Sequence, residues 1–148
     1  MQFYIYADGS CKGNPGKGGF AYMIYDELGE IWYEGSGTHK KTTNNQMELF
    51  AVIEALRVLK KNQTNYQVKI YSDSAYVVNC FLENWIEKWE ENGWKTQKKE
   101  DVANQDFWRV LNDLVIESGA VFERISRSDK KIKKVDEKAK TASKKTIE

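Results

Sequence analysis

The alternation of apolar and polar residues along the chain predicts five β-strands. A period of two places successive side chains on opposite faces of a sheet. The first and the fourth of these segments each end on an aspartate, Asp8 and Asp73. The second and third are joined by a short Asp-Glu-Leu-Gly turn and should form an antiparallel hairpin. The five segments are residues 2–8, 20–25, 30–34, 66–73 and 121–125.

A helical period of 3.6 residues predicts four helices in the remaining sequence. The longest follows Thr43 and Asn44, either of which can cap it, and should end near residues 60–62. Its apolar arc contains Glu48, a carboxylate that is costly to bury without a partner or a metal ion. Most such residues are capping partners or pair with a buried Arg or Lys. The other helices are predicted over residues 75–82, 104–118 and 129–145, the last being lysine-rich and weakly packed.

This order of elements predicts one domain, residues 1–148, of the α/β class. Its expected core is a five-stranded mixed sheet flanked by helices, in the order βββαβααβα. Residues 9–19 are expected to form a glycine-rich turn between the first two strands. The Gly-Lys-Gly sequence in this turn leads into a strand rather than a helix, which excludes a phosphate-binding P-loop. In sheets of this kind, sites form beyond the carboxyl ends of the parallel strands.

The composition excludes several classes of protein. The chain is 41% hydrophobic with a formal net charge of +1, so it is globular, and its overall charge does not indicate a nucleic-acid partner. His39 is the only histidine, which argues against a zinc site and against Ser/His or Cys/His catalysis. The chain opens on a strand without a signal peptide, and it has no apolar run of membrane-spanning length. We therefore expect a cytoplasmic monomer in which Cys11 and Cys80 are free thiols.

Three carboxylates are expected to meet at one edge of the sheet. Asp8 and Asp73 end two strands that can lie side by side, and the helix that carries Glu48 lies between them in sequence. Carboxylates held together repel one another, and a hard divalent cation such as Mg²⁺ relieves this repulsion. Two such ions, about 4 Å apart, would activate a water molecule and stabilise the leaving oxygen in phosphoryl transfer.

Three sequence blocks resemble the type 1 ribonuclease H family. They are YADGSCKGNPG at residues 6–16, TTNNQMEL at residues 42–49 and YSDSAYV at residues 71–77. Their order and spacing agree with the family over nearly the entire chain. The resemblance implies the ribonuclease H-like fold and an endonuclease that cuts the RNA strand of RNA–DNA hybrids. It also implies a mechanism with two Mg²⁺ ions, for which Mn²⁺ can substitute, and products with 3′-hydroxyl and 5′-phosphate ends.

The resemblance further implies which residues act. Asp8, Glu48 and Asp73 would be catalytic metal ligands. The family's fourth carboxylate matches Asp136, with Asp129 as the fallback. The hybrid would be bound by a DNA-phosphate pocket, by minor-groove contacts and by bare backbone near the RNA 2′-hydroxyls. The residues expected to make these contacts are Gly9, Ser10, Cys11, Lys12, Asn14, Lys41, Thr43, Asn44 and Asn45.

Some segments depart from the family pattern. Residues 126–130 lack the loop histidine of many members, and Arg127 and Lys130 are candidate substitutes. The handle-like insertion, residues 84–100, is acidic rather than basic, so a weaker or shifted contact with DNA is expected. Its tryptophans are expected to pack as a core rather than to stack on bases. The lysine-rich C-terminal helix and tail, residues 129–148, are interpreted as a solvated face.

Two other hypotheses stay open beside the nuclease. The same fold supports strand transfer and junction resolution, so the substrate could differ while the chemistry stays similar. The missing loop histidine instead suggests a hybrid-binding ribonuclease H-like protein with impaired catalysis. Intact carboxylates at Asp8, Glu48 and Asp73 count against this last hypothesis.

Overall fold

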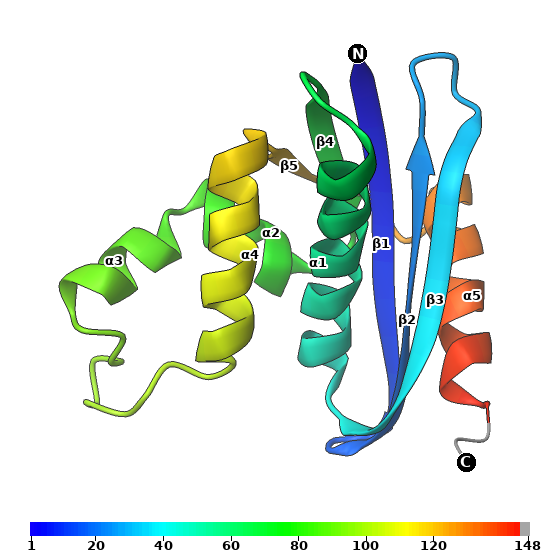
Figure 1. The fold of residues 1–148 in the computed structure, drawn as a ribbon. Helices are drawn as coiled ribbons and strands as arrows, with labels where there is room; N and C mark the ends of the chain where they lie inside the picture. Colours follow the sequence, from blue (N-terminus) through cyan, green and yellow to red (C-terminus); the bar gives the residue numbers. More distant parts are fainter. Residues whose placement is uncertain (146–148) are drawn as a thin grey trace.

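The computed structural model describes residues 1–145, in which five strands form one mixed sheet (Figure 1). The strands are β1 (Gln2–Gly13), β2 (Gly16–Tyr25), β3 (Ile31–Thr42), β4 (Gln67–Ser72) and β5 (Val121–Arg124). Their order in the sheet is β3-β2-β1-β4-β5. β1 is antiparallel to β2 and parallel to β4, and β4 is parallel to β5. The predicted α/β class with a mixed sheet is confirmed.

Helices cover both faces of this sheet. They are α1 (Asn44–Asn62), α2 (Ala75–Leu82), α3 (Trp85–Glu91), α4 (Gln105–Ser118) and α5 (Lys130–Ser143). α1 packs on β1 and β2 and supports α4, while α5 packs on the opposite face against β1, β2 and β3 (Figure 1). α3, a short helix inside the tryptophan-rich segment, adds to the predicted elements and extends away from the sheet.

Most of the glycine-rich segment is strand, and only Asn14 and Pro15 form a turn, so β2 begins at Gly16 rather than at residue 20. β1 does not end at Asp8 but continues to Gly13, because Gly9 to Gly13 pair in register with β2. At two of these glycines, the absence of a side chain lets a helix pack directly against the sheet. A Cβ on Gly9 would lie 2.5 Å from the backbone nitrogen of Glu48, and one on Gly19 would lie 2.4 Å from that of Ser143. The glycines therefore mark where α1 and α5 approach the sheet.

The C-terminal helix is firmly packed, contrary to the expectation of a weakly packed one. α5 buries Ile132, Val135, Ala139 and Ala142, each at most 1% exposed, against the face of the sheet opposite α1. Near Gly19 the buried apolar residues of the helix are alanines, Ala139 and Ala142, so the helix can lie close to β2 there. The last part of the predicted tail, residues 146–148, lies outside the described residues.

The tryptophan-rich segment joins the main core. Trp108 on α4 is fully buried, Trp94 is 8% exposed, and the ring of Trp89 lies 5.7 Å from Trp108 and 5.8 Å from Trp94. Each of these rings therefore packs against another aromatic ring. This packing confirms that the tryptophans form part of a core; that they do not stack on bases stays a prediction.

Both cysteines are free thiols, as the sequence predicted, with Cys80 buried and Cys11 half-buried. No helix within residues 1–145 combines the length and apolar character needed to cross a membrane.

Candidate active site

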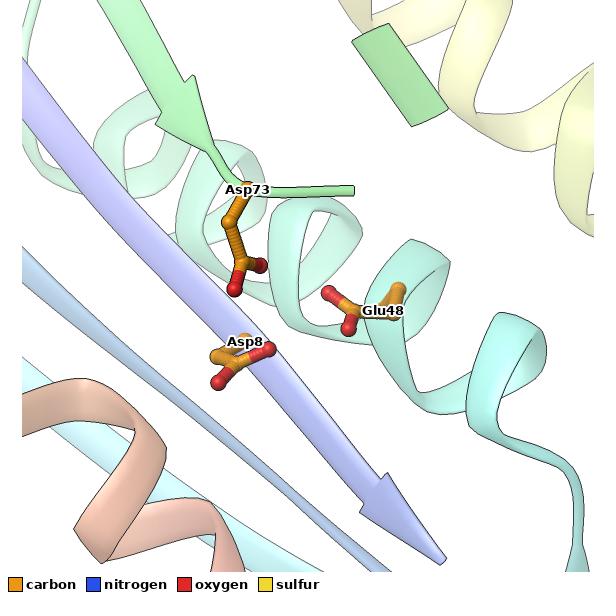
Figure 2. Close-up of side chains that lie close together, drawn as sticks. All are labelled: Asp8, Glu48 and Asp73. Atoms are coloured by element: carbon orange, nitrogen blue, oxygen red, sulfur yellow. The ribbon is translucent and has the colours of Figure 1, made fainter. Parts of the chain in front are cut away.

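Asp8, Glu48 and Asp73 converge beside the sheet, and Figure 2 shows their carboxylates turned toward a common space. One oxygen of each side chain lies within 4.8 Å of the others. Asp8 projects from the middle of β1, Glu48 lies near the start of α1, and Asp73 follows the last residue of β4. The parallel pairing of β1 with β4 sets the spacing of the two aspartates. Close contact between α1 and Gly9 brings Glu48 to them.

α5 brings a fourth carboxylate to the same space. Asp136 lines the cavity with the other three acids and lies near enough to Asp8 for each to shift the pKa of the other. Asp129 has a different role, because its Oδ1 accepts hydrogen bonds from the backbone nitrogens of Lys131 at 2.9 Å and Ile132 at 3.0 Å. Asp129 is thus the N-cap of α5. This geometry favours Asp136 over Asp129 as the fourth member of the site.

Glu48 is the least satisfied of these acids. Burial raises the pKa of Glu48 well above its ordinary value, and the negative charges of Asp8 and Asp73 raise it further. Its Oε2 atom is buried and has no hydrogen-bond partner among the described residues. Glu48 does not cap α1 either, since Thr43 accepts the hydrogen bond from the backbone nitrogen of Gln46. An orphaned carboxylate oxygen that faces other carboxylates is an available ligand for a cation.

Asp8 is also poised to hold a proton. Burial raises its pKa from 3.8 to about 7, with further increases from the hydrogen bond to Asp136 and the charge of Asp73. Its Oδ1 accepts a hydrogen bond from the backbone nitrogen of Gly9 at 2.9 Å, which fixes the carboxyl and partly offsets the increase. Both pKa shifts therefore favour the protonated form of the inner acids when no cation is present.

Asp136 behaves in the opposite way. Partial burial raises its pKa, but hydrogen bonds with Asp8 and Lys140 outweigh this increase. The charges of Lys140 and Arg127 contribute in the same direction, so the pKa of Asp136 is lowered overall. Lys140 Nζ lies 2.9 Å from Asp136 Oδ2, and Arg127 Nε lies 3.4 Å from Asp73 Oδ2. Of the two basic candidates for the missing histidine, Arg127 lines the cavity and Lys130 does not.

Five of the predicted substrate-binding residues line the same cavity of about 680 Å³. They come from two adjacent pieces of chain, the second half of β1 and the first turn of α1. The entrance to the cavity that contains the acids is therefore open and lined by polar groups. The five residues are Gly9, Ser10, Cys11, Asn44 and Asn45.

The other four predicted substrate-binding residues lie outside the cavity lining, around the tip of the β1–β2 hairpin. Lys12 and Asn14 belong to that tip, and both are exposed. The pairing of Gly16 with Thr42 brings the tip beside the end of β3, where Lys41 and Thr43 lie. A second group of polar residues therefore flanks the carboxylate site at the same end of α1.

Sequence reasoning missed several residues that line the cavity. Lys140 stands four residues after Asp136 on one helix, a spacing that pairs side chains and could have revealed it. Arg124 ends β5, which is parallel to β4, so its position beyond the carboxyl ends of the strands was also readable. Tyr76 gave no such signal, because only the packing of α2 turns it toward the site.

Comparison with known proteins shows which family this chain resembles. The RNase H family model matches residues 1–144. The ribonuclease H of Acetivibrio thermocellus is 54% identical over 111 residues, which are 74% of this chain and 71% of that relative. The ribonuclease H of Syntrophomonas wolfei subsp. wolfei is 44% identical over 124 residues, which are 84% of this chain and 82% of that relative.

Solved structures agree with the sequence relatives. LC9-RNase H1, described as a type 1 RNase H with the type 2 active-site motif, has a TM-score of 0.83 and 27% identity over 96% of this chain and 72% of its own. LC11-RNase H1 in complex with an RNA/DNA hybrid has a TM-score of 0.75 and 26% identity over 95% of each chain.

Fold and site together define a nuclease of the hydrolase class, in which a mixed sheet presents clustered carboxylates. The chain belongs to the ribonuclease H family, whose model spans nearly all of it. The resemblance drawn from the three sequence blocks is thereby confirmed.

Proposed function

We propose that the protein hydrolyses phosphodiester bonds within the RNA strand of RNA–DNA hybrids, with two divalent cations, leaving 3′-hydroxyl and 5′-phosphate ends. The observation that carries this proposal is the group of three carboxylates, Asp8, Glu48 and Asp73, with oxygens within 4.8 Å of one another in an open polar cavity. The complex of the similar LC11-RNase H1 with an RNA/DNA hybrid supports this choice of substrate.

The residues present fit a hard divalent cation. All four acids offer carboxylate oxygens, the donors that Mg²⁺ and Mn²⁺ prefer, and the Oε2 atom of Glu48 lacks any other partner in the described chain. We assign Asp8, Glu48, Asp73 and Asp136 as the ligands. When bound, the ions supply a nucleophilic hydroxide at neutral pH and stabilise the leaving oxygen.

The chain itself prepares this site. Burial raises the pKa of Asp8 and that of Glu48, so cation binding favours the loss of protons from these carboxyl groups. Their positions are fixed by regular backbone, since Asp8 lies inside the β1 ladder and Glu48 inside α1. A rigid set of ligands avoids reorganisation when the substrate arrives.

Hybrid recognition is proposed along two adjacent surfaces. Backbone of Gly9 to Lys12 would lie against the RNA strand and its 2′-hydroxyls, beside the minor-groove contacts of Asn44 and Asn45. Asn14, Lys41 and Thr43 at the hairpin tip would hold a DNA phosphate. Thr43 Oγ1 already accepts a hydrogen bond from the backbone nitrogen of Gln46 at 3.1 Å, and its hydroxyl hydrogen remains available to donate to a phosphate oxygen. All of these groups come from one chain, so a monomer suffices.

The decisive experiment follows a labelled RNA strand annealed to DNA. The same RNA alone and in an RNA duplex serves as control, each with Mg²⁺, with Mn²⁺ and with chelator. We expect cutting of the hybrid only, dependent on metal, with 3′-hydroxyl and 5′-phosphate products. Measurable hybrid binding without cutting in either metal would contradict the proposal and favour the hybrid-binding protein with impaired catalysis.

A further inference from the structure

Three basic side chains line the carboxylate cavity, and two of them, Arg127 and Lys140, form ion pairs with its acids. Lys140 Nζ lies 2.9 Å from Asp136 Oδ2 on one side of the site, and Arg127 Nε lies 3.4 Å from Asp73 Oδ2 on the other. Both side chains line the cavity. Among the ion pairs of residues 1–145, the inner acids Asp8 and Glu48 have no basic partner. The built-in cations thus neutralise the outer acids only.

These two ion pairs are placed so that they can break. The side chain of Arg127 is 90% exposed, and that of Lys140 is 60% exposed. Exposed ion pairs contribute little stability, because water screens them and holding two side chains together costs entropy. Arg127 lies between β5 and α5, outside any helix or strand, and Lys140 extends from the last turns of α5. Neither cation is locked in position by surrounding packing.

We infer that Arg127 pairs with Asp73, and Lys140 with Asp136, only while the site is free of metal. When divalent cations bind these carboxylates, the two basic side chains leave them and bind backbone phosphates of the nucleic acid instead. The inference rests on the proposed function and adds two residues to it. Divalent ions compete for the same carboxylate oxygens and repel the neighbouring positive side chains. The phosphates offer both side chains a new anionic partner, which guanidinium and ammonium groups bind well.

This exchange predicts effects of opposite sign from a single substitution. R127Q or K140Q should lower the dissociation constant for Mg²⁺ about 3- to 10-fold, because a competitor and its repulsion are both removed. The same variant should bind the hybrid about 2- to 10-fold more weakly at low salt, because a phosphate contact is lost. A residue with a purely structural role would weaken both interactions together.

The test uses the full chain stripped of metal with a chelator. Mg²⁺ and Mn²⁺ binding are measured by titration calorimetry, without nucleic acid. Hybrid binding is measured by fluorescence anisotropy in Ca²⁺ over a range of salt, and the recovered RNA is checked to be uncut. For each variant, the slope of log affinity against log salt should become shallower by about 0.7 to 0.9, the change expected for one phosphate contact.

Matched controls remove the same charge outside the cavity. K138Q is the control for K140Q, because Lys138 lies on the same helix but pairs with Glu34 on β3. R57Q serves for Arg127, because Arg57 pairs with Glu54 on α1. Both controls should change metal and hybrid affinity less than about twofold.

The possible outcomes distinguish failure of the proposed exchange from failure of the proposed nuclease function. Tighter metal binding together with a shallower salt slope supports the exchange. Unchanged metal affinity in both variants, or an unchanged salt slope in both, overturns it while leaving the proposed nuclease intact. Absence of divalent-metal binding by the unmodified protein would instead overturn the proposed function.

Discussion

The carboxylate cavity and the tryptophan-rich segment meet at Tyr76, yet they contribute to the fold in opposite ways. Tyr76 lines the cavity, and its ring lies 6.4 Å from that of Trp85 in the segment and 5.2 Å from that of Trp108 in the core beneath it. On the cavity side, Asp8 is 3% exposed and Glu48 has a buried oxygen without a partner. On the other side, aromatic rings pack against one another and only the outer surface is charged.

The difference shows how the chain divides stability from function. Buried apolar rings stabilise the folded state in proportion to the area they remove from water. Buried carboxylates destabilise it until a cation neutralises them. Substitutions in the cavity should therefore remove activity without unfolding the protein, and substitutions in the aromatic core should do the reverse.

The largest expected effect is the loss of cleavage in D8N. The substitution removes an anionic ligand while preserving the shape of the side chain. We expect the rate of hybrid cleavage to fall at least about a thousandfold, because several kcal/mol of transition-state stabilisation depends on the bound ions. Circular dichroism should confirm an unchanged fold, and cleavage at the normal rate would refute the ligand assignment of Asp8.

W108A should have the opposite profile. Trp108 is fully buried, and its Nε1 donates a hydrogen bond to the hydroxyl of Tyr76 at 3.0 Å. Its truncation should lower the free energy of unfolding by about 3 to 5 kcal/mol, measured with urea. W108F keeps most of the ring volume and should lose less. Activity per folded molecule should persist, and a selective loss of cleavage in fully folded W108A would break the contrast between the regions.

The pH dependence of stability provides the third test. Asp8 has a folded pKa of about 7 against an ordinary value of 3.8, so the folded state binds its proton more tightly than the unfolded state. Its favourable contribution is complete below about pH 4 and is lost as the pH rises through about 7. In chelator, D8N should therefore equal the unmodified protein near pH 4 and exceed its stability by up to about 4 kcal/mol near pH 8.

Thermal and urea unfolding across this pH range would measure the difference. Added Mg²⁺ should reduce it, because the cation stabilises only the protein that binds it well. If D8N were no more stable to unfolding than the unmodified protein at alkaline pH, the buried Asp8 carboxylate would not destabilise the fold.

Two aspartates on the last helix provide a smaller and more selective contrast. D136N should lower cleavage about a hundredfold or more, because a ligand is lost beside Asp8. D129N should retain both activity and stability, since Asn caps a helix as well as Asp does. D129A should cost about 1 kcal/mol of stability through loss of the cap. Equal loss of activity in D129N and D136N would overturn the choice between them.

Much of this fold was predictable from local pattern. The long periodic run of α1 and the alternation in β1 and β4 reflect burial on one face, which the sequence records directly. The extension of β1 to Gly13 was not predictable in this way. Glycine has a low strand propensity, and these residues are held in the sheet by pairing with β2 and by the close approach of α1.

The site was predictable where a charge interrupts an apolar pattern. Glu48 stood out on the apolar arc of α1, and Asp136 lies on the corresponding stripe of α5, four residues after Ile132 and three before Ala139. The sequence alone did not separate Asp136 from Asp129, because that choice depends on which part of α5 faces Asp8. The ion pair between Arg127 and Asp73 joins residues whose proximity only the folded chain establishes.

The smallest expected effect concerns the acidic surface of the tryptophan-rich segment. Glu87, Glu90 and Glu91 are exposed on α3, so they take no part in the aromatic core beneath. Their replacement by Gln should change the free energy of unfolding by less than about 0.5 kcal/mol. Hybrid affinity should rise about 2- to 5-fold at low salt, because repulsion of the phosphates falls, and the gain should vanish near about 0.5 M salt.

E30Q is the matched control, because Glu30 is exposed in the turn between β2 and β3, away from the handle. It should leave hybrid affinity unchanged at every salt concentration. If the triple variant also bound the hybrid with unchanged affinity at low salt, α3 would lie outside the path of the nucleic acid. The tryptophan-rich segment would then serve stability alone, and its contrast with the carboxylate cavity would be complete.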